Sequence, residues 1–233
     1  QVLTRGGKDL AESGTALYAI SPWLESCKTV TVDAAPRFGT DKPRRTIKTH
    51  LPTSICPYSP EARYIYVVRH PVSCFASCVD FIRGNLGQFA PSLEQCESWF
   101  RSDKMMWWGT WPTHVAGWWS WAQEKDNVLF IRFQDMKRDL SEVARQVAGF
   151  LEVTDLDNDA LQNIVHRCSF QYMQQHADSF EMHPPHLLQA NGRFFVSGKI
   201  SRYRDIPQEM ADRISDWCRR ELSACGVPDD EIF

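Results

Sequence analysis

The sequence predicts an α/β fold of three layers, in which helices flank a central parallel sheet. The strongest strand signal is Ala62–Val68, whose apolar and β-branched residues are typical of a strand buried on both faces. Pro71 follows closely and suits the first turn of a helix. A second apolar run, Val128–Phe133, precedes a helical pattern over 140–151. Alternation of strand and helix is typical of a parallel sheet with crossover helices.

The elements around these runs follow from local patterns. Branched apolar residues predict short strands at 30–32 and 45–48. We expect the helix that begins with proline to cover 71–83. A tryptophan-rich helix over 114–121 leads into the strand that begins at Val128.

The C-terminal half is predicted to be largely helical. Apolar residues at Val143, Val147 and Phe150 give 140–151 its helical spacing. Further elements are expected in three places: helices over 157–166 and 206–224, and a loop over 182–192. Consecutive prolines and an Asn-Gly pair mark the loop. The last helix is amphipathic, with apolar residues at Met210, Ile214, Trp217, Cys218 and Leu222.

Length and charge limit the class of protein. At 233 residues the chain is long enough for one well-buried domain, and we treat 1–233 as a single domain. The net charge of −3 provides no global basic field, so we expect no nucleic-acid partner. No run has the apolar length of a membrane span, so no membrane partner is expected.

The cysteines favour a reduced protein. The chain has eight of them and no CxxC pair, so neither a zinc site nor another metal site is expected. Cys74 and Cys78 lie four residues apart, one helical turn, and we interpret them as two buried thiols. This cysteine usage fits a cytoplasmic location.

Lys48 and His50 lie where a predicted strand ends, in the segment KTHLP. A histidine can remove a proton from an attacking hydroxyl near neutral pH. A lysine two residues earlier points the same way on a strand and can neutralise a developing negative charge. On local grounds alone, a solvated lysine and a capping histidine at a strand end are the favoured explanation of the segment.

Arg69 ends the strongest predicted strand, and Ser77 follows on the next helix. Together they can bind a phosphate through guanidinium and hydroxyl hydrogen bonds near a helix N-terminus. A surface ion pair and a serine bonded to its own helix explain the same two residues.

Six tryptophans crowd one stretch of the chain: Trp107, Trp108, Trp111, Trp118, Trp119 and Trp121. Such clusters can line a pocket for a flat acceptor, bind a cation or stack on a nucleobase. Core packing is the commonest explanation of aromatic clusters. The cluster favours an aromatic or lipophilic ligand only if its rings face a pocket.

Several ordered motifs now point to one family. In chain order they are Gly6-Gly7-Lys8-Asp9, Pro22-Trp23-Leu24-Glu25, KTHLP at 48–52, YIYVVRHPVSCFAS at 64–77, WGTWPTHVAGWW at 108–119, FIRFQDMKRD at 130–139, and Cys168-Ser169-Phe170 with Met173. The chain resembles the cytosolic sulfotransferases, which use 3′-phosphoadenylyl sulfate (PAPS) as donor. The resemblance covers about residues 1 to 205 and implies a P-loop NTPase-like sulfotransferase fold.

The resemblance also implies roles for individual residues. His50 would deprotonate the acceptor, and Lys48 would stabilise the bridging oxygen of the donor. Residues implied to bind the nucleotide are Arg69, Ser77, Phe133, Cys168, Ser169, Phe170, Met173, Gly198 and Lys199. Those implied to border the acceptor are His114, Trp111 and Phe81. The implied acceptor is a hydroxyl or amine of a small molecule, the nucleotide product is adenosine 3′,5′-bisphosphate (PAP), and no metal is required.

The chain departs from the family pattern in several places. No YPKSGTTW loop is present, and alignment on the GGD motif places that loop upstream of Gln1, so we expect an N-terminally truncated domain. Val196 and Ser197 stand where the family has an arginine and a lysine that hold the 3′-phosphate. Phe133 replaces a tyrosine and Cys168 a threonine near the adenine. The family's KxxFTVxxxE dimer segment is missing from 204–213, so the oligomeric state stays open.

Two other functions compete with a sulfotransferase. A catalytically degenerate relative would bind the nucleotide or another ligand without turnover, which Val196 and the missing loop favour. A P-loop kinase relative would share the fold, but the histidine of KTHLP and the lack of an acidic Mg²⁺ site oppose it.

Overall fold

The structure is a computed structural model that describes residues 1–4, 6–7, 14–39, 42–106, 108–154, 156–180 and 205–233. These residues form two compact units, each described by itself. Unit 1 contains the described residues of 1–50 and 139–180, and unit 2 those of 51–138 and 205–233.

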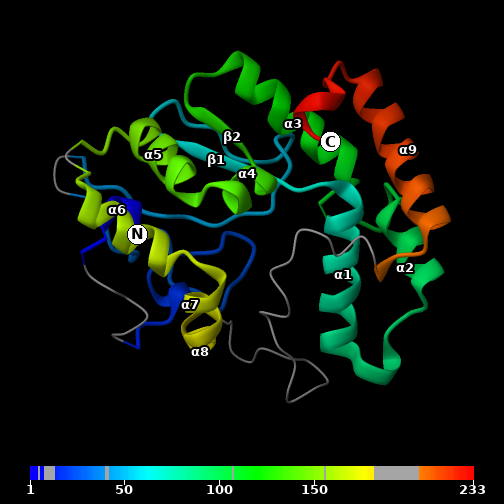
Figure 1. The fold of residues 1–233 in the computed structure, drawn as a ribbon, viewed down its shortest axis with the longest axis horizontal. Helices are drawn as coiled ribbons and strands as arrows, with labels where there is room; N and C mark the ends of the chain where they lie inside the picture. The colour runs from blue at the N-terminus through cyan, green and yellow to red at the C-terminus, as the bar shows by residue number, and fades with distance from the viewer. Residues whose placement is uncertain (5, 8–13, 40–41, 107, 155, 181–204) are drawn as a thin grey trace. The chain divides into compact units, whose positions relative to one another are not determined.

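Unit 2 is built on a two-stranded parallel sheet. Strand β1 (Tyr64–Val68) pairs with β2 (Val128–Arg132) in a register that sets Tyr64 opposite Val128 and Val68 opposite Arg132. Figure 1 shows the two strands side by side. The buried Asn127 fixes the start of the pair, since its amide nitrogen donates to the carbonyls of Ser59 and Ala62, each at 3.0 Å.

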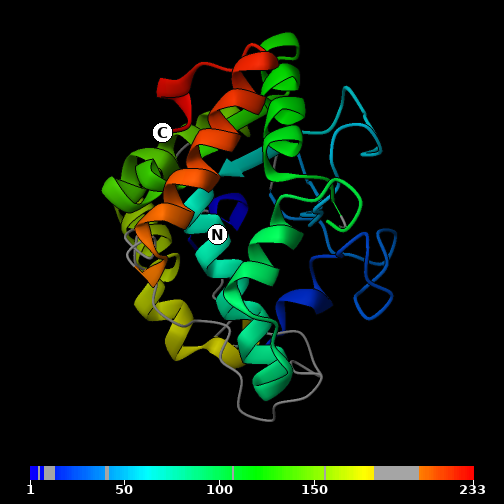
Figure 2. The same cartoon turned by 90° about the vertical axis from the view of Figure 1, so that its right-hand side faces the viewer.

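Unit 2 also contains five α-helices: α1 (Pro71–Leu86), α2 (Leu93–Phe100), α3 (Trp111–Glu124), α4 (Phe133–Arg138) and α9 (Gln208–Ala224). Helices α3 and α4 pack against β2. Proline opens both α1 and α3, as expected where the first-turn N–H groups lack helical partners. Short 3₁₀ turns cover Gly87–Phe89 and Asp229–Glu231. Figure 2 shows α9 against α1 and α3, and these three helices enclose the main core.

Unit 1 contains α5 (Leu140–Phe150), α6 (Asn158–Arg167), α7 (Phe170–Gln175) and α8 (Ala177–Phe180), with 3₁₀ turns at Val2–Thr4 and Leu17–Ala19. An aspartate caps both longer helices: Asp139 accepts from the Glu142 N–H, and Asp157 from the Ala160 N–H. Leu161 and Ile164 form a small core with Ala144.

The predicted helices over 71–83, 114–121, 140–151, 157–166 and 206–224 are confirmed, although their ends shift by a few residues. The strand predicted over 128–133 ends one residue early, because Phe133 begins α4. The loop predicted over 182–192 lies outside the described residues.

The strands predicted at 30–32 and 45–48 are wrong. Thr31 lies in a turn closed by a hydrogen bond from the Ala35 N–H to its carbonyl. In the second segment Lys48 forms an isolated bridge with Trp23, and the bridge between Arg44 and Phe38 lies just before it. At both places the backbone groups bond within a turn or in a single bridge, so no ladder of paired residues forms there.

The prediction that β1 is buried on both faces is also wrong. Ile65 is 41% exposed and Val67 is 45% exposed, while Val68 is buried. The described sheet therefore carries helices against one side of β1, and alternate residues face away from them.

Candidate functional site

The backbone around Lys48 and His50 is fixed by a neighbouring segment of unit 1. The Lys48 N–H donates to the Pro22 carbonyl at 2.8 Å, and the Lys48 carbonyl accepts from the Leu24 N–H at 3.1 Å. Glu25 completes the arrangement, since its Oε1 accepts from the Thr49 hydroxyl at 2.8 Å and from the His50 N–H at 2.6 Å. One carboxylate therefore positions the end of the KTHLP segment.

The side chains of Lys48 and His50 both contact Trp23. The Lys48 ammonium lies 4.4 Å from the indole centroid and donates to the Tyr18 hydroxyl at 2.8 Å. The His50 imidazole packs edge-on against the same indole, with centroids 5.2 Å apart. Lys48 is half-buried and His50 exposed. The Trp23 indole therefore holds the Lys48 ammonium and the His50 imidazole next to the same ring.

Arg69, Ser77 and Phe133 meet in unit 2. Arg69 follows β1, and Ser77 lies on α1, so a short connection brings them together. The Arg69 Nη1 donates to the Ser77 hydroxyl at 2.6 Å. Phe133 follows the parallel strand β2, and the Arg69 guanidinium lies 4.8 Å from its ring centroid. Arg69 and Phe133 thus follow the carboxyl ends of two neighbouring strands, and Ser77 is added by the helix after β1, as expected for a ligand site of an open α/β sheet.

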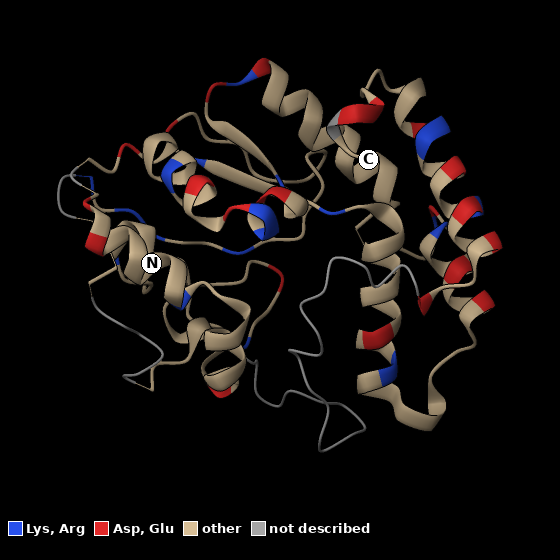
Figure 3. Cartoon of the chain, in the orientation of Figure 1, with Lys and Arg blue, Asp and Glu red and all other residues tan. Residues whose placement is uncertain are grey.

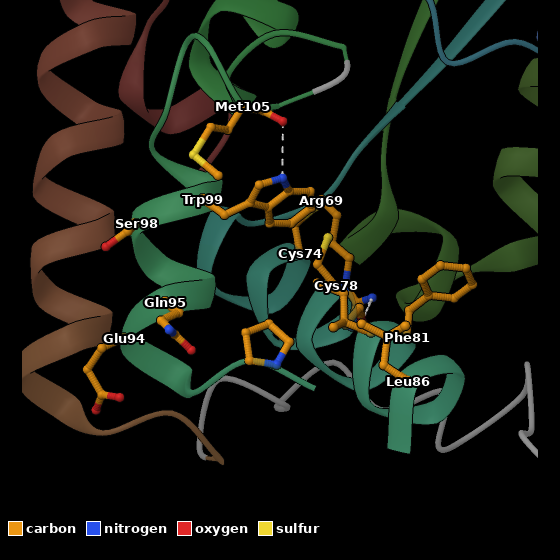
Figure 4. A pocket seen from close by; sticks show the side chains of 13 residues that line it. Arg69, Cys74, Cys78, Phe81, Leu86, Glu94, Gln95, Ser98, Trp99 and Met105 are labelled. Atoms are coloured by element: carbon orange, nitrogen blue, oxygen red, sulfur yellow. Dashed lines mark hydrogen bonds between the residues drawn. The ribbon is translucent and has the colours of Figure 1, made fainter. Parts of the chain in front are cut away.

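A pocket of about 820 Å³ opens beside these residues within unit 2 (Figure 4). Its walls come from α1, α2 and the segment that follows α2. The lining side chains are Arg69, Cys74, Ser77, Cys78, Phe81, Ile82, Leu86, Pro91, Glu94, Gln95, Ser98, Trp99 and Met105. The predicted acceptor residue Phe81 is exposed and shares this pocket with Arg69 and Ser77.

His114 and Trp111 lie apart from that lining. The His114 Nδ1 and the Tyr66 hydroxyl form a hydrogen bond of 3.0 Å. Burial strongly raises the pKa of Tyr66, which keeps its hydroxyl neutral and able to donate. Trp111 is buried in the core of unit 2. The structure therefore connects His114 with a tyrosine and uses Trp111 for packing.

Most of the tryptophan-rich stretch packs inside unit 2, as core packing predicts. Trp118 is buried, stacks on Tyr66 at 5.4 Å and donates its indole N–H to the Leu51 carbonyl at 3.2 Å. Trp119 and Trp121 pack against core residues. Trp107 lies outside the described residues.

Phe133 lies in unit 2, and the other predicted adenine residues, Cys168–Phe170 and Met173, lie in unit 1. Cys168 ends α6, and burial raises its pKa. Ser169 caps α7 by accepting from the Tyr172 N–H, which presents Phe170 and Met173 on the following helix. Gly198 and Lys199, together with Val196 and Ser197, lie outside the described residues.

Sequence reasoning missed Tyr18, Glu25 and Tyr66 as site residues. Each acts on a predicted residue from a distant point of the chain: Tyr18 on Lys48, Glu25 on His50 and Tyr66 on His114. Glu25 and Tyr66 fall within quoted motifs, which were their only signal.

Two negative findings concern the described part of the chain. No group of three or more His, Cys, Asp or Glu there has the arrangement of a metal site. No helix there has the length and apolar character needed to cross a membrane.

Figure 3 shows acidic and basic residues interspersed along α9.

Comparisons with known proteins agree with the motifs. The family model described as "Sulfotransferase domain" matches residues 3–226. Sulfotransferase 1C2 of Rattus norvegicus is 30% identical over 136 residues, which cover 56% of this chain and 45% of the relative. Luciferin sulfotransferase of Photinus pyralis is 28% identical over 202 residues, which cover 81% of this chain and 53% of the relative. The matches thus span about half the length of these relatives.

A solved structure gives the fold. Retinol dehydratase, crystallised in complex with androsterone and the inactive cofactor PAP, superposes with a TM-score of 0.67 at 21% identity, over 78% of this chain and 54% of that one. The two chains share the sulfotransferase fold, of which the described residues contain a small parallel sheet and its helices. By the family model that spans nearly its whole length, this chain belongs to the sulfotransferase domain family.

Proposed function

We propose that this protein transfers a sulfuryl group from PAPS to a hydroxyl or amine of a small, lipophilic acceptor. Family membership and the PAP bound in the retinol dehydratase structure support the choice of donor. The observation that carries the proposal is the grouping of Arg69 and Phe133, which follow the carboxyl ends of two parallel strands, with Ser77 of α1.

These three residues fit a phosphate that is attached to a nucleoside. The guanidinium and hydroxyl offer several N–H and O–H donors on one side, which suits a multiply charged phosphate. The Phe133 ring stacks on the guanidinium and holds its plane in place. We assign the 3′-phosphate of the donor to Arg69 and Ser77.

Lys48 and His50 carry the chemistry in this proposal. Sulfuryl transfer needs a base for the acceptor proton and positive charge near the leaving oxygen, with positioning as the main contribution. His50 accepts the acceptor proton, and its backbone is held by Glu25. Lys48 stabilises the charge that develops on the leaving oxygen, and Tyr18 and Trp23 restrict its ammonium to one region.

The names of relatives support a lipophilic acceptor. The solved relative holds androsterone, and a curated relative is named for luciferin. In this chain, Phe81, Leu86 and Trp99 give the pocket of unit 2 a largely apolar wall. Apolar walls with a few polar groups are typical of small-molecule sites.

The test is a thermal-shift titration of this chain with PAP. A ligand that binds only the folded state raises the melting temperature, by an amount that grows with its concentration. We expect a saturable rise in the wild-type chain and in Arg83→Ala, which removes an exposed arginine from the same helix. Arg69→Ala should lose most of the rise, and Arg69→Lys should keep only part of it.

Turnover separates an enzyme from a degenerate binding protein. With isotope-labelled PAPS and a panel of phenols and hydroxysteroids, His50→Ala should lose about 100-fold or more of the rate while it keeps the PAP-induced shift. His166→Ala removes another exposed histidine of unit 1 and should keep the rate. No shift in the wild type, or an equal shift in Arg69→Ala, would contradict the proposed nucleotide site.

A further inference from the structure

The pocket of unit 2 has a polar end and a larger apolar part. Its described lining contains one cation, Arg69, which lies beside Ser77 (Figure 4). The apolar part is formed by side chains of α1, of α2 and of the segments next to α2: Phe81, Ile82, Leu86, Pro91, Trp99 and Met105. A ligand that fills both parts carries one anionic group and a larger apolar group.

Arg69 and Ser77 supply hydrogen-bond donors at the polar end. The Arg69 Nη1 donates to the Ser77 oxygen at 2.6 Å, so the hydroxyl hydrogen of Ser77 can point to an anion. The Arg69 guanidinium lies 4.8 Å from the Phe133 ring centroid, a contact that restricts its orientation. A planar guanidinium beside a hydroxyl suits the two oxygens of a carboxylate.

The wall next to this polar end is apolar. Cys74 and Cys78 lie one turn apart on α1 and line the pocket. They are half-buried rather than buried, which corrects the expectation from the sequence. A free cysteine packs as a small hydrophobic side chain. The Phe81 ring lines the same pocket and is 57% exposed, so a ligand can cover it.

Glu94 is the other charged residue of the described lining. Its side chain is exposed, and its carboxylate accepts from the Ser92 hydroxyl at 2.9 Å. Figure 4 shows this carboxylate turned away from Arg69. The charge that a ligand meets inside the pocket is therefore the positive charge of Arg69, which favours an anion over a neutral or cationic ligand.

We propose that this pocket binds lipophilic monocarboxylates, with the carboxylate on Arg69 and Ser77 and the alkyl chain along the apolar side chains of α1 and α2. Its volume of about 820 Å³ lies within the range of small-molecule sites, about 300–1,000 Å³. This assignment does not depend on sulfuryl transfer. Because it shares Arg69 and Ser77 with the proposed 3′-phosphate site, a bound carboxylate and PAP should exclude each other.

Isothermal titration calorimetry of this chain with decanoate, in buffer free of PAP, tests the proposal. We expect saturable binding of one decanoate per chain. Octanoate has two methylene groups fewer and should bind about 10-fold more weakly. Decan-1-ol and decylammonium keep the alkyl chain without the anion, and each should bind at least about 5-fold more weakly than decanoate.

Two pairs of variants connect binding with the pocket. Arg69→Met removes the guanidinium and should weaken decanoate binding at least about 10-fold, whereas Arg83→Met changes an exposed arginine of α1 outside the described lining and should not. Phe81→Ala should weaken binding several-fold. Phe89→Ala removes a ring that is 69% exposed and outside the described lining, and should leave binding unchanged. Circular dichroism checks the folding of all four variants.

A titration with PAP separates this inference from the proposed function. Where PAP binds, its apparent dissociation constant should rise in proportion to the decanoate concentration. Decanoate binding without PAP binding would contradict the nucleotide site and support the carboxylate site. The carboxylate site is overturned if decanoate does not bind, if decan-1-ol binds as tightly, if folded Arg69→Met keeps the wild-type affinity, or if PAP and decanoate bind together.

Discussion

His70 connects the end of β1 with α1 and responds to pH at the scale of a single residue. Its ring packs edge-on against Phe233 with centroids 5.3 Å apart. Burial lowers the pKa of His70, and the nearby Arg219 guanidinium lowers it further. The folded protein therefore resists protonation of this side chain, although a histidine in the unfolded chain titrates near 6.5.

We expect the free energy of unfolding to rise with pH through the window below 6.5. In that window the unfolded chain binds the proton that folded His70 does not, so lower pH favours unfolding. Above 6.5 His70 is neutral in both the folded and the unfolded state, so its contribution to the free energy of unfolding no longer changes with pH. Urea unfolding at pH values from 5 to 8 measures the free energy of unfolding at each pH. This free energy should rise more steeply with pH for the wild type than for His70→Gln. An identical dependence on pH in the two proteins would mean that His70 does not couple protonation to folding.

At the scale of elements, α2 and α9 are joined by a charged contact. Glu97 of α2 is 7% exposed and accepts from Arg213 of α9 through both oxygens, at 3.2 and 2.8 Å. Arg101, the residue that follows α2, donates to the same carboxylate at 3.3 Å. Hydrogen bonds from Arg213 hold the pKa of Glu97 below its usual range. The carboxylate needs these partners, because burying an unpaired charge is costly.

Glu97→Gln should lower the free energy of unfolding by about 1–3 kcal/mol, as expected for a hydrogen bond to a charged group. The change keeps the size of the side chain, removes its charge and replaces one accepting oxygen by an amide NH₂ that cannot accept from an arginine. Glu221→Gln, on the exposed side of α9, is the matched control and should change stability by less than about 0.5 kcal/mol. Chemical denaturation of both variants measures the difference, and equal losses would contradict a specific role for Glu97.

At the scale of the whole molecule, the described residues form three hydrophobic clusters, two in unit 2 and one in unit 1. In unit 2, α1, α3 and α9 bury Phe75, Val115 and Ile214 completely. In unit 1, Leu161 and Ile164 supply a much smaller core. The pocket lies beside the larger core, so the side chains of α1 that line it are supported by packed residues on the other face of the helix.

Phe75→Ala should cost about 3–5 kcal/mol of the free energy of unfolding, since it removes a fully buried ring and leaves a cavity. Phe89→Ala makes the same chemical change at a side chain that is 69% exposed and should cost little. Urea unfolding followed by far-UV circular dichroism compares the two. A cost for Phe75→Ala near that of Phe89→Ala would show that the core of unit 2 is not centred on this ring.

The sequence alone determined features whose parts lie close together along the chain. The five helices follow from apolar spacing, proline and aspartate caps, all of which act within one or two turns. Arg69 and Ser77 are eight residues apart, on a strand end and the helix that follows it, so their meeting could be predicted. The order of the motifs also indicated the family that the comparisons then showed.

Tertiary structure decided the contacts between distant segments and the exposure of each face. Tyr66 and His114 are 48 residues apart, Tyr18 and Lys48 are 30 apart, and Glu97 and Arg213 are 116 apart. No local periodicity encodes such pairs, because they arise when elements pack and buried polar groups must find partners. The packing of elements also decides that Cys74 and Cys78 are half-buried and that Ile65 and Val67 are exposed. Spacing predicts which residues share a face, and only the packing of other elements decides whether that face is covered.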